Sequence, residues 1–93
     1  MLYVRLCLDA PGSLDLRRKH REERQAYLDS GAIRIIEGGP VCASDSGDAY
    51  VGTFMLIEAD SREEVVAYHQ NDPFTKAGIY ERSFIMRFKK NIG

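Results

Sequence analysis

His20 and Asp72 are the two side chains in this sequence whose types best fit acid–base chemistry. Histidine is the one side chain whose unperturbed pKa lies near neutral pH. A neighbouring carboxylate can fix the tautomer of the imidazole and tune its basicity. His20 lies in a charged stretch, and Asp72 opens an Asp-Pro-Phe turn much later in the chain. We therefore predict a proton-transferring His–Asp dyad, on the condition that the fold brings the two side chains together.

Each candidate also has an ordinary structural interpretation. The charged run from Arg17 to Arg24 is typical of a solvated helix face, and His20 would then be one polar residue among several. Asp72 before a proline is common turn chemistry, in which the carboxylate accepts hydrogen bonds from nearby backbone amides. His69 fits a helix end, where a cation suits the helix dipole. On the residues alone, a solvated His20 is the favoured interpretation.

Several further residues are candidates for the walls of a site around this pair. Arg17 lies one turn before His20, where it would steer or anchor an anionic substrate. A Gly-Gly-Pro segment is a turn or bulge by default, and otherwise allows close backbone approach to a ligand. The sequence has no phosphate loop, zinc-ligand spacing or nucleophile elbow, so we expect no metal and no cofactor. The predicted substrate-binding residues are Arg17, Tyr27, Gly39, Pro40 and Phe74.

Composition limits the classes of protein to consider. The 93 residues predict one domain spanning 1–93, and the 13 basic and 14 acidic residues nearly cancel. This balance gives no reason to expect nucleic acid or a membrane as a partner. Cys7 fits a buried apolar position and Cys42 a partly exposed one, with a disulfide between them left open. No signal peptide or membrane span is apparent, so a reducing, cytoplasmic location is the default expectation.

Alternating and helical periodicities divide the chain into six elements. A breaker cluster and Ser13 as N-cap precede the first helix, which should end at Gly31. The second helix should begin with a capping box formed by Ser61 and Glu64 and end before Pro73. We expect Gly38-Gly39-Pro40 to end the second strand. The predicted strands are residues 2–8, 32–37, 50–58 and 80–88, and the first helix is residues 14–30.

The order β-α-β-β-α-β predicts an α+β, ferredoxin-like fold with a four-stranded antiparallel sheet and two helices on one face. The strands are apolar on both faces, and the helices cover only one of them. We therefore expect a homodimer in which two sheets pack face to face around a barrel-like core, a dimeric α/β barrel.

The combination of motifs resembles the YciI-like (YCII-related) family of small dimeric α/β-barrel proteins. The resemblance rests on Arg17-x-x-His20, Gly31, Gly39-Pro40, the Ser61-x-x-Glu64 helix start, Asp72-Pro73-Phe74 and Ala77-Gly78. It implies a dimeric ferredoxin-like fold and a site centred on His20 and Asp72. The best-defined activity in this family is the removal of HCl from a chlorinated hydroxyhydroquinone, a lyase reaction without a cofactor.

Three functions follow from these observations. The first is a cofactor-independent lyase or isomerase in which His20 is the base and Asp72 orients it, acting on a small, aromatic or other ring substrate. The second is a non-catalytic dimeric module that binds a small molecule or a protein. The third, an RNA-binding domain, shares the element order but lacks the basic-Gly-aromatic motif at Tyr50-Val51-Gly52-Thr53-Phe54. We rank it last.

Overall fold

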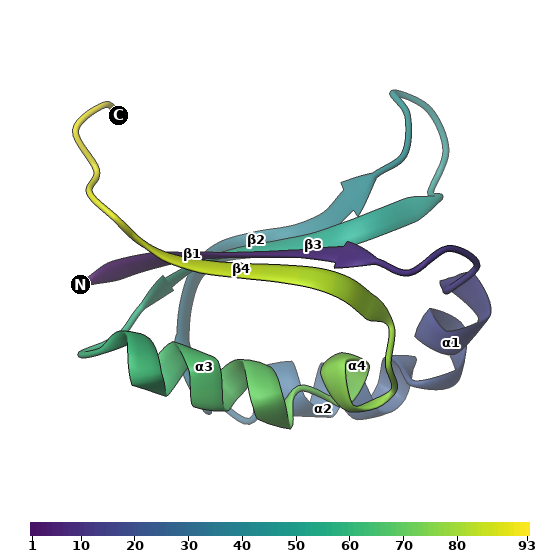
Figure 1. The fold of residues 1–93 in the computed structure, drawn as a ribbon, viewed down its shortest axis with the longest axis horizontal. Coiled ribbons are helices and arrows are strands. Elements are labelled where there is room, and N and C mark those ends of the chain that lie inside the picture. Colours follow the sequence, from purple (N-terminus) through teal and green to yellow (C-terminus); the bar gives the residue numbers. More distant parts are fainter.

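Four antiparallel strands form a single sheet in the order β2-β3-β1-β4, so the two sequence-distant strands β1 and β3 lie side by side at its centre (Figure 1). The computed structural model describes residues 1–93. The strands are β1 (Leu2–Asp9), β2 (Arg34–Cys42), β3 (Tyr50–Glu58) and β4 (Tyr80–Phe88). This is the predicted ferredoxin-like α+β arrangement, and its strand order matches the split βαβ motif.

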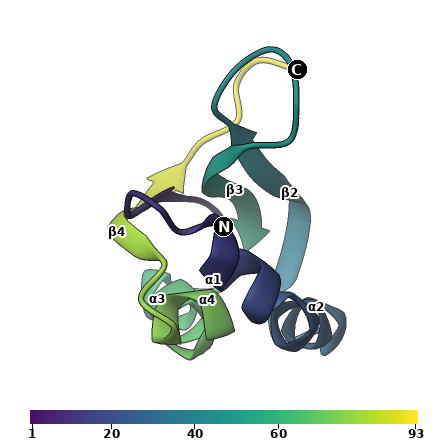
Figure 2. The ribbon, with the colours of Figure 1, turned by 90° about the vertical axis from the view of Figure 1, so that its right-hand side faces the viewer.

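The helices all lie on one face of the sheet, in two groups. They are α1 (Leu14–Lys19), α2 (Arg21–Asp29), α3 (Arg62–Asn71) and α4 (Pro73–Lys76). Figure 2 shows α2 beneath the β2 side of the sheet, and α3 and α4 beneath the β4 side. The two groups therefore stand apart under opposite halves of the sheet, with α1 joining α2 to the end of β1.

The first helix is not continuous, which corrects the predicted helix over residues 14–30. His20 has φ −102° and ψ 10°, outside the helical region, and separates α1 from α2. Hydrogen bonds still cross the break, because the His20 amide donates to the Leu16 carbonyl and the His20 carbonyl accepts from the Arg24 amide. Gly31 follows α2 with a φ of 69°, as its predicted position at the helix end requires.

The second strand is longer than predicted. β2 runs from Arg34 to Cys42, through the Gly38-Gly39-Pro40 segment that was expected to end it. The pairing with β3 shifts register between Ile35 and Glu37, so the irregularity is a bulge and not the end of the strand. Because β2 is an edge strand, a proline within it costs no ladder hydrogen bond.

Side-chain capping sets the start of α3 and α4 but not that of α1. The Glu64 amide donates to Ser61 Oγ, as the predicted capping box requires, and the Phe74 amide donates to Asp72 Oδ1 at the start of α4. Ser13 precedes α1 without a side-chain cap, since its hydroxyl donates to the Ala10 carbonyl at 2.6 Å.

The two faces of the sheet differ in their surroundings. On the helix side of β1, Tyr3, Arg5 and Cys7 are buried, and Met55 and Ile57 of β3 join them. The opposite face carries aliphatic and aromatic side chains without a covering layer. Cys7 is buried and Cys42 exposed as expected, and both are free thiols, so no disulfide links them.

Candidate active site

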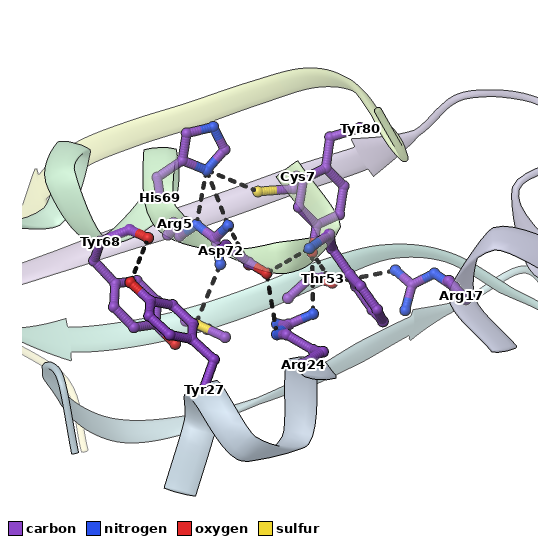
Figure 3. A network of polar contacts seen from close by, with 12 residues as sticks. Arg5, Cys7, Arg17, Arg24, Tyr27, Thr53, Tyr68, His69, Asp72 and Tyr80 are labelled. Carbon is purple, nitrogen blue, oxygen red and sulfur yellow. Dashed lines mark hydrogen bonds and ion pairs between the residues drawn. The ribbon is translucent and has the colours of Figure 1, made fainter. Parts of the chain in front are cut away.

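A buried carboxylate, Asp72, is the centre of a polar network between the sheet and the helices (Figure 3). Its side chain is fully buried, because it lies between the end of α3 and the underside of the sheet. Oδ2 accepts a hydrogen bond from Arg5 Nη2 at 2.8 Å, and Oδ1 accepts from the Phe74 amide at 2.9 Å. A second guanidinium approaches, with Arg24 Nε 3.5 Å from Oδ1. A single carboxylate is thus shared by two arginines.

Arg5 projects from the central strand β1 into the interior, where its side chain is fully buried. Its guanidinium donates hydrogen bonds to Asp72 and to Met55 Sδ. The central guanidinium carbon, Cζ, lies 5.6 Å from the ring centre of Tyr68 and 5.6 Å from that of Tyr80. Burial opposes the positive charge of Arg5, but the neighbouring Cys7, Asp72 and Tyr80 groups outweigh that cost and raise its pKa. Arg5 is therefore a permanent cation inside the fold.

His69, at the end of α3, accepts hydrogen bonds from Arg5. Its Nδ1 lies 3.1 Å from Arg5 Nε and 2.9 Å from Arg5 Nη2, and 3.9 Å from Cys7 Sγ. Since Arg5 can only donate, Nδ1 must be unprotonated and the ring proton must be on Nε2. Burial and then the charge of Arg5 lower the pKa of His69, which keeps the ring neutral. His69 is thus more than the helix-end residue that the sequence indicated.

Arg24 extends the network from α2 towards β3 and β4. Its Nη1 donates to the Tyr80 hydroxyl at 3.3 Å, and that hydroxyl lies 2.9 Å from Thr53 Oγ1. Arg24 Nε is buried and has no hydrogen-bond partner, since its approach to Asp72 does not meet hydrogen-bond geometry. Burial raises the pKa of Tyr80, so its hydroxyl stays protonated beside these cations.

Arg17 from α1 is the third cation of the network. It makes a bidentate pair with Asp9, Nε to Oδ2 at 2.6 Å and Nη2 to Oδ1 at 3.0 Å. The same Nη2 reaches the Gly52 carbonyl and Thr53 Oγ1 on β3. Burial opposes the charge, but the hydrogen bonds and charge of Asp9 raise the pKa of Arg17. This pair is neutral as a whole, whereas Arg5 and Arg24 together exceed the charge of Asp72.

A cavity of about 790 Å³ opens beside this network, between the α1–α2 segment and strands β2 and β3. Four arginines line it from the helices, with Asp48 as the one acidic residue of the lining. Its aromatic and apolar walls include Tyr50, Met55, Phe74 and Pro40. The arginines of this wall are Arg17, Arg18, Arg21 and Arg24. A pocket of this size and charge suits a small molecule with anionic character.

The predicted pair of His20 and Asp72 is not joined by any hydrogen bond or ion pair. His20 Nδ1 lies 3.2 Å from Glu23 Oε1 on the same helix, and its side chain is 25 % exposed. Asp72 is instead occupied by Arg5, Arg24 and the α4 amide. The structure therefore shows no direct contact between His20 and Asp72, and their catalytic roles stay a prediction.

Four of the five predicted substrate-binding residues line the cavity: Arg17, Gly39, Pro40 and Phe74. Tyr27 does not, because its ring stacks on Tyr68 with centroids 4.8 Å apart and its hydroxyl donates to the Tyr68 carbonyl. Neither His20 nor Asp72 belongs to the cavity wall, although Arg18 and Arg21, close to His20 in the chain, do. The binding roles of these residues stay a prediction.

Sequence reasoning missed Arg5, Arg24 and His69. A signal for Arg5 was present, because it alternates with Tyr3 and Cys7 and so shares one strand face with them. Charged residues are rarely buried, so the pattern alone favoured exposure. Arg24 was hidden in a run of charges whose other members are mostly solvated. His69 gave no distinctive signal.

The polar network contains no candidate metal site. No group of three or more His, Cys, Asp or Glu side chains lies together in the structure. Burial raises the pKa of the Cys7 thiol, which makes it a poor metal ligand or nucleophile. None of the helices has the length and apolar character that a membrane span requires.

Comparisons with known proteins place these features in a family. A family model, the YCII-related domain, matches residues 1–89. Protein YciI of Escherichia coli O6:H1 is 34 % identical over 98 residues, covering 97 % of this chain and 98 % of the relative. The derivative of benzaldehyde biosynthesis cluster protein C of Emericella nidulans is 33 % identical over 75 residues, covering 75 % of this chain and 74 % of the relative.

A solved structure is similar over nearly the whole chain. It is 5-chloro-2-hydroxyhydroquinone dehydrochlorinase from Burkholderia phenoliruptrix AC1100, in complex with 2,5-dihydroxybenzoquinone. Its TM-score is 0.91 at 35 % sequence identity, and the match covers 98 % of this chain and 96 % of that one. On the match of its sequence and fold, this chain belongs to the YCII-related domain family.

Proposed function

We propose that this protein is a small cofactor-independent enzyme that performs acid–base chemistry, an elimination or isomerisation, on a ring compound bound in the arginine-lined cavity. The observation that carries the proposal is the buried pair of guanidiniums, Arg5 and Arg24, around the single carboxylate of Asp72, with Arg24 also lining the cavity. Such an arrangement is costly for folding and suits a site where negative charge develops on a substrate.

Family membership supports the reaction class. The related dehydrochlorinase is named for removing HCl from a hydroxylated, chlorinated ring. An elimination of this kind needs a group that accepts a proton and an environment that stabilises an oxyanion. The cavity offers cations for the second task, and aromatic and apolar walls for the ring.

His20 is the proposed proton acceptor, with Glu23 in the orienting role first assigned to Asp72. The Glu23 carboxylate lies within 3.2 Å of His20 Nδ1, so it can hold the ring with Nε2 directed away from α2. His20 also joins α1 to α2, and its neighbours Arg17 and Arg21 line the cavity. In this proposal Asp72 acts through Arg24, as a positioning residue.

Chloride release from 5-chloro-2-hydroxyhydroquinone is the first assay, followed by a screen of related hydroxylated rings. We expect turnover by the natural sequence, and a loss of about 10²–10⁴-fold in His20→Ala, the usual contribution of positioned proton transfer. Asp72→Asn should lower turnover through the disturbed Arg24.

Glu23→Gln and Glu22→Gln form a matched pair of controls. Both remove one carboxylate from the first turn of α2, but only Glu23 contacts His20. Turnover should fall in the first variant and persist in the second. Full activity in His20→Ala would refute its role as base, and a protein that binds rings without turning any over would support the non-catalytic binding module.

A homodimer through the open face of the sheet is part of the same proposal. Leu6 on β1 lies opposite Phe54 on β3 and Phe84 on β4, and these pairs continue along the strands. Phe84 and Met86 are 38 % and 55 % exposed, which is unusual for large apolar side chains in register. The β2–β3 loop and the C-terminal tail both extend from this side of the sheet (Figure 1), and in this proposal a second copy packs against the face beside them.

A further inference from the structure

We propose that Arg17 and Arg24 form a clamp for one ionised oxygen group, so that the ligand of the cavity is a ring compound bearing a carboxylate or an ionised hydroxyl. This inference rests on the proposed function only in using the same cavity, and it specifies the substrate class. It concerns binding and holds whether or not the protein is a catalyst.

Arg17 presents one free nitrogen from an anchored guanidinium. Its Nε and Nη2 are held by Asp9, the Gly52 carbonyl and Thr53, whereas Nη1 has no partner in the protein. The side chain is only 10 % exposed, yet Nη1 is not among the buried atoms that lack a partner. Nη1 therefore keeps some contact with solvent, and Arg17 is one of the residues that line the cavity.

Arg24 is held in a similar way on the neighbouring helix. Asp72 lies behind its Nε and the Tyr80 hydroxyl accepts from Nη1, which leaves Nη2 without a partner. The side chain is 7 % exposed and lines the same cavity. Its Nη2 is likewise not among the buried unpartnered atoms. The two arginines are therefore nearly buried and held in place by protein groups, and each has one guanidinium nitrogen without a partner: Nη1 of Arg17 and Nη2 of Arg24.

Phe74 brings the two arginines to one place. The guanidinium carbon of Arg24 lies 4.5 Å from the centre of the Phe74 ring, and that of Arg17 lies 5.2 Å from the same centre. Both cations therefore lie next to one aromatic ring at the cavity wall. An oxygen group at the edge of this ring, within reach of both guanidiniums, would receive charged hydrogen bonds from both, and these are the strong class of hydrogen bond.

The charges around the clamp favour an anion over a neutral ligand. Asp9 neutralises Arg17, but Asp72 is shared between Arg5 and Arg24, so the buried groups keep one positive charge in excess. His69 is neutral and does not compensate this excess positive charge. Arg18 and Arg21 add cations at the rim, against Asp48 alone. A ligand with one ionised oxygen group would complete the balance.

Calorimetric titration with two probes of equal shape tests the clamp. The probes are 2,5-dihydroxybenzoate and 2,5-dihydroxybenzamide, which differ in the charge of one group. We expect the carboxylate to bind about tenfold or more tightly than the amide, as a charged hydrogen bond provides. Arg17→Gln and Arg24→Gln should each abolish most of this preference.

Arg34→Gln is the matched control, because Arg34 does not line the cavity and forms an exposed pair with Glu58. It should change carboxylate affinity by no more than about twofold, as expected for a screened surface charge. If Arg24→Gln fails to fold, the side-chain N–H signals of Arg17 and Arg24 in the natural protein give the answer. They should shift on adding the benzoate and not the benzamide.

Equal affinity for the two probes, no binding of either at millimolar concentration, or an equal loss in Arg34→Gln and Arg24→Gln would each overturn the clamp. The chloride-release assay is separate from these titrations. A protein that prefers the benzoate but turns over no substrate keeps the clamp and loses the proposed function. A protein that turns over the substrate but shows no preference for the benzoate keeps the proposed function and loses the clamp.

Discussion

The two faces of the sheet reverse the usual distribution of polarity. The helix-covered face buries Arg5, with Asp72, Arg24 and Arg17 packed against it. The open face presents Phe84, Met86 and other apolar side chains to solvent. A monomer selected for stability alone would favour the opposite arrangement, since buried charges cost desolvation and exposed apolar area gains nothing.

The difference indicates that the two faces serve different ends. The inner face holds cations in fixed positions at a cost in desolvation free energy, as the preorganised site of the proposed function would. The outer face keeps apolar area available for association, which would compensate for the small core of a chain of 93 residues. Substitutions on each face should therefore have different consequences.

The largest loss of stability is expected for Asp72→Asn. The amide keeps the shape and the cap of α4 but removes the charge between Arg5 and Arg24, which leaves two buried cations uncompensated. We expect about 3–5 kcal/mol of destabilisation, the cost of breaking a buried ion pair, measured by urea unfolding. Asp15→Asn, on an exposed pair with Arg18, should have no measurable effect. Equal stability of Asp72→Asn and the natural protein would show that the network is not stabilised by charge.

On the open face, Leu6→Lys should change assembly more than folding. The lysine would place a charge at the centre of the proposed interface, opposite Phe54 and Phe84, where burying it is costly. We expect sedimentation velocity to show a dimer for the natural protein at micromolar concentration and a monomer for the variant. Ala67→Lys, at an exposed position on α3, should stay dimeric. A monomeric natural protein would exclude the homodimer.

His69 should make the inner face sensitive to acid. Its folded pKa is lowered by burial and by Arg5, so the unfolded chain binds the proton more readily than the native protein. Stability is therefore complete above about pH 6.5, the ordinary histidine pKa, and declines as the pH falls towards and through the lower folded pKa.

The matched variant for this effect is His69→Asn, whose amide oxygen can accept from Arg5 but does not titrate. The difference in unfolding free energy between the two proteins should shrink or reverse between pH 7 and pH 5, because only the natural protein loses stability through His69. Parallel curves over this range would mean that the pKa of His69 is not lowered in the folded protein. The other titratable groups near His69 are Cys7, Asp72 and Tyr80.

The smallest effect is expected for Tyr27→Phe, which removes a neutral contact of the inner face. Its hydroxyl donates to the Tyr68 carbonyl at 2.9 Å, while the stacked rings would remain. We expect about 1 kcal/mol of destabilisation, typical of one neutral hydrogen bond, from thermal and urea unfolding. Tyr50→Phe is the control, since it retains the ring beside Arg17. A loss as large as that of Asp72→Asn would contradict the distinction between neutral and charged contacts.

The fold was predictable because strand alternation and helix caps are local signals. Residues 50–58 and 80–88 form the predicted strands, and Ser61 caps α3 as the capping box indicated. The continuation of β2 through Gly38-Gly39-Pro40 was not predictable from the sequence. Proline is tolerated on an edge strand, but the sequence does not show which strands are at the edges of the sheet.

The site was only partly predictable because its contacts depend on tertiary packing. Asp72 and Phe74 were identifiable from the turn, but the partner of Asp72 is Arg5 on β1, and not His20. Residues far apart in the chain meet through the strand order, which no local pattern gives. The break at His20 likewise depends on how α1 and α2 fit under the sheet, and no local pattern in the charged run indicates it.

The two oxygens of Asp72 have different partners, and this constrains how the protein can change during evolution. Oδ1 holds the amide that begins α4, and Oδ2 holds Arg5. Any single replacement leaves either a helix end or a cation without its partner, so this position can change only together with Arg5 or Arg24. Rim residues such as Arg18 and Arg21 are free of that restriction. Among related proteins, we expect new substrate preferences to arise through substitutions of cavity-lining residues such as Arg18 and Arg21. The buried group of Asp72, Arg5 and Arg24 should stay unchanged.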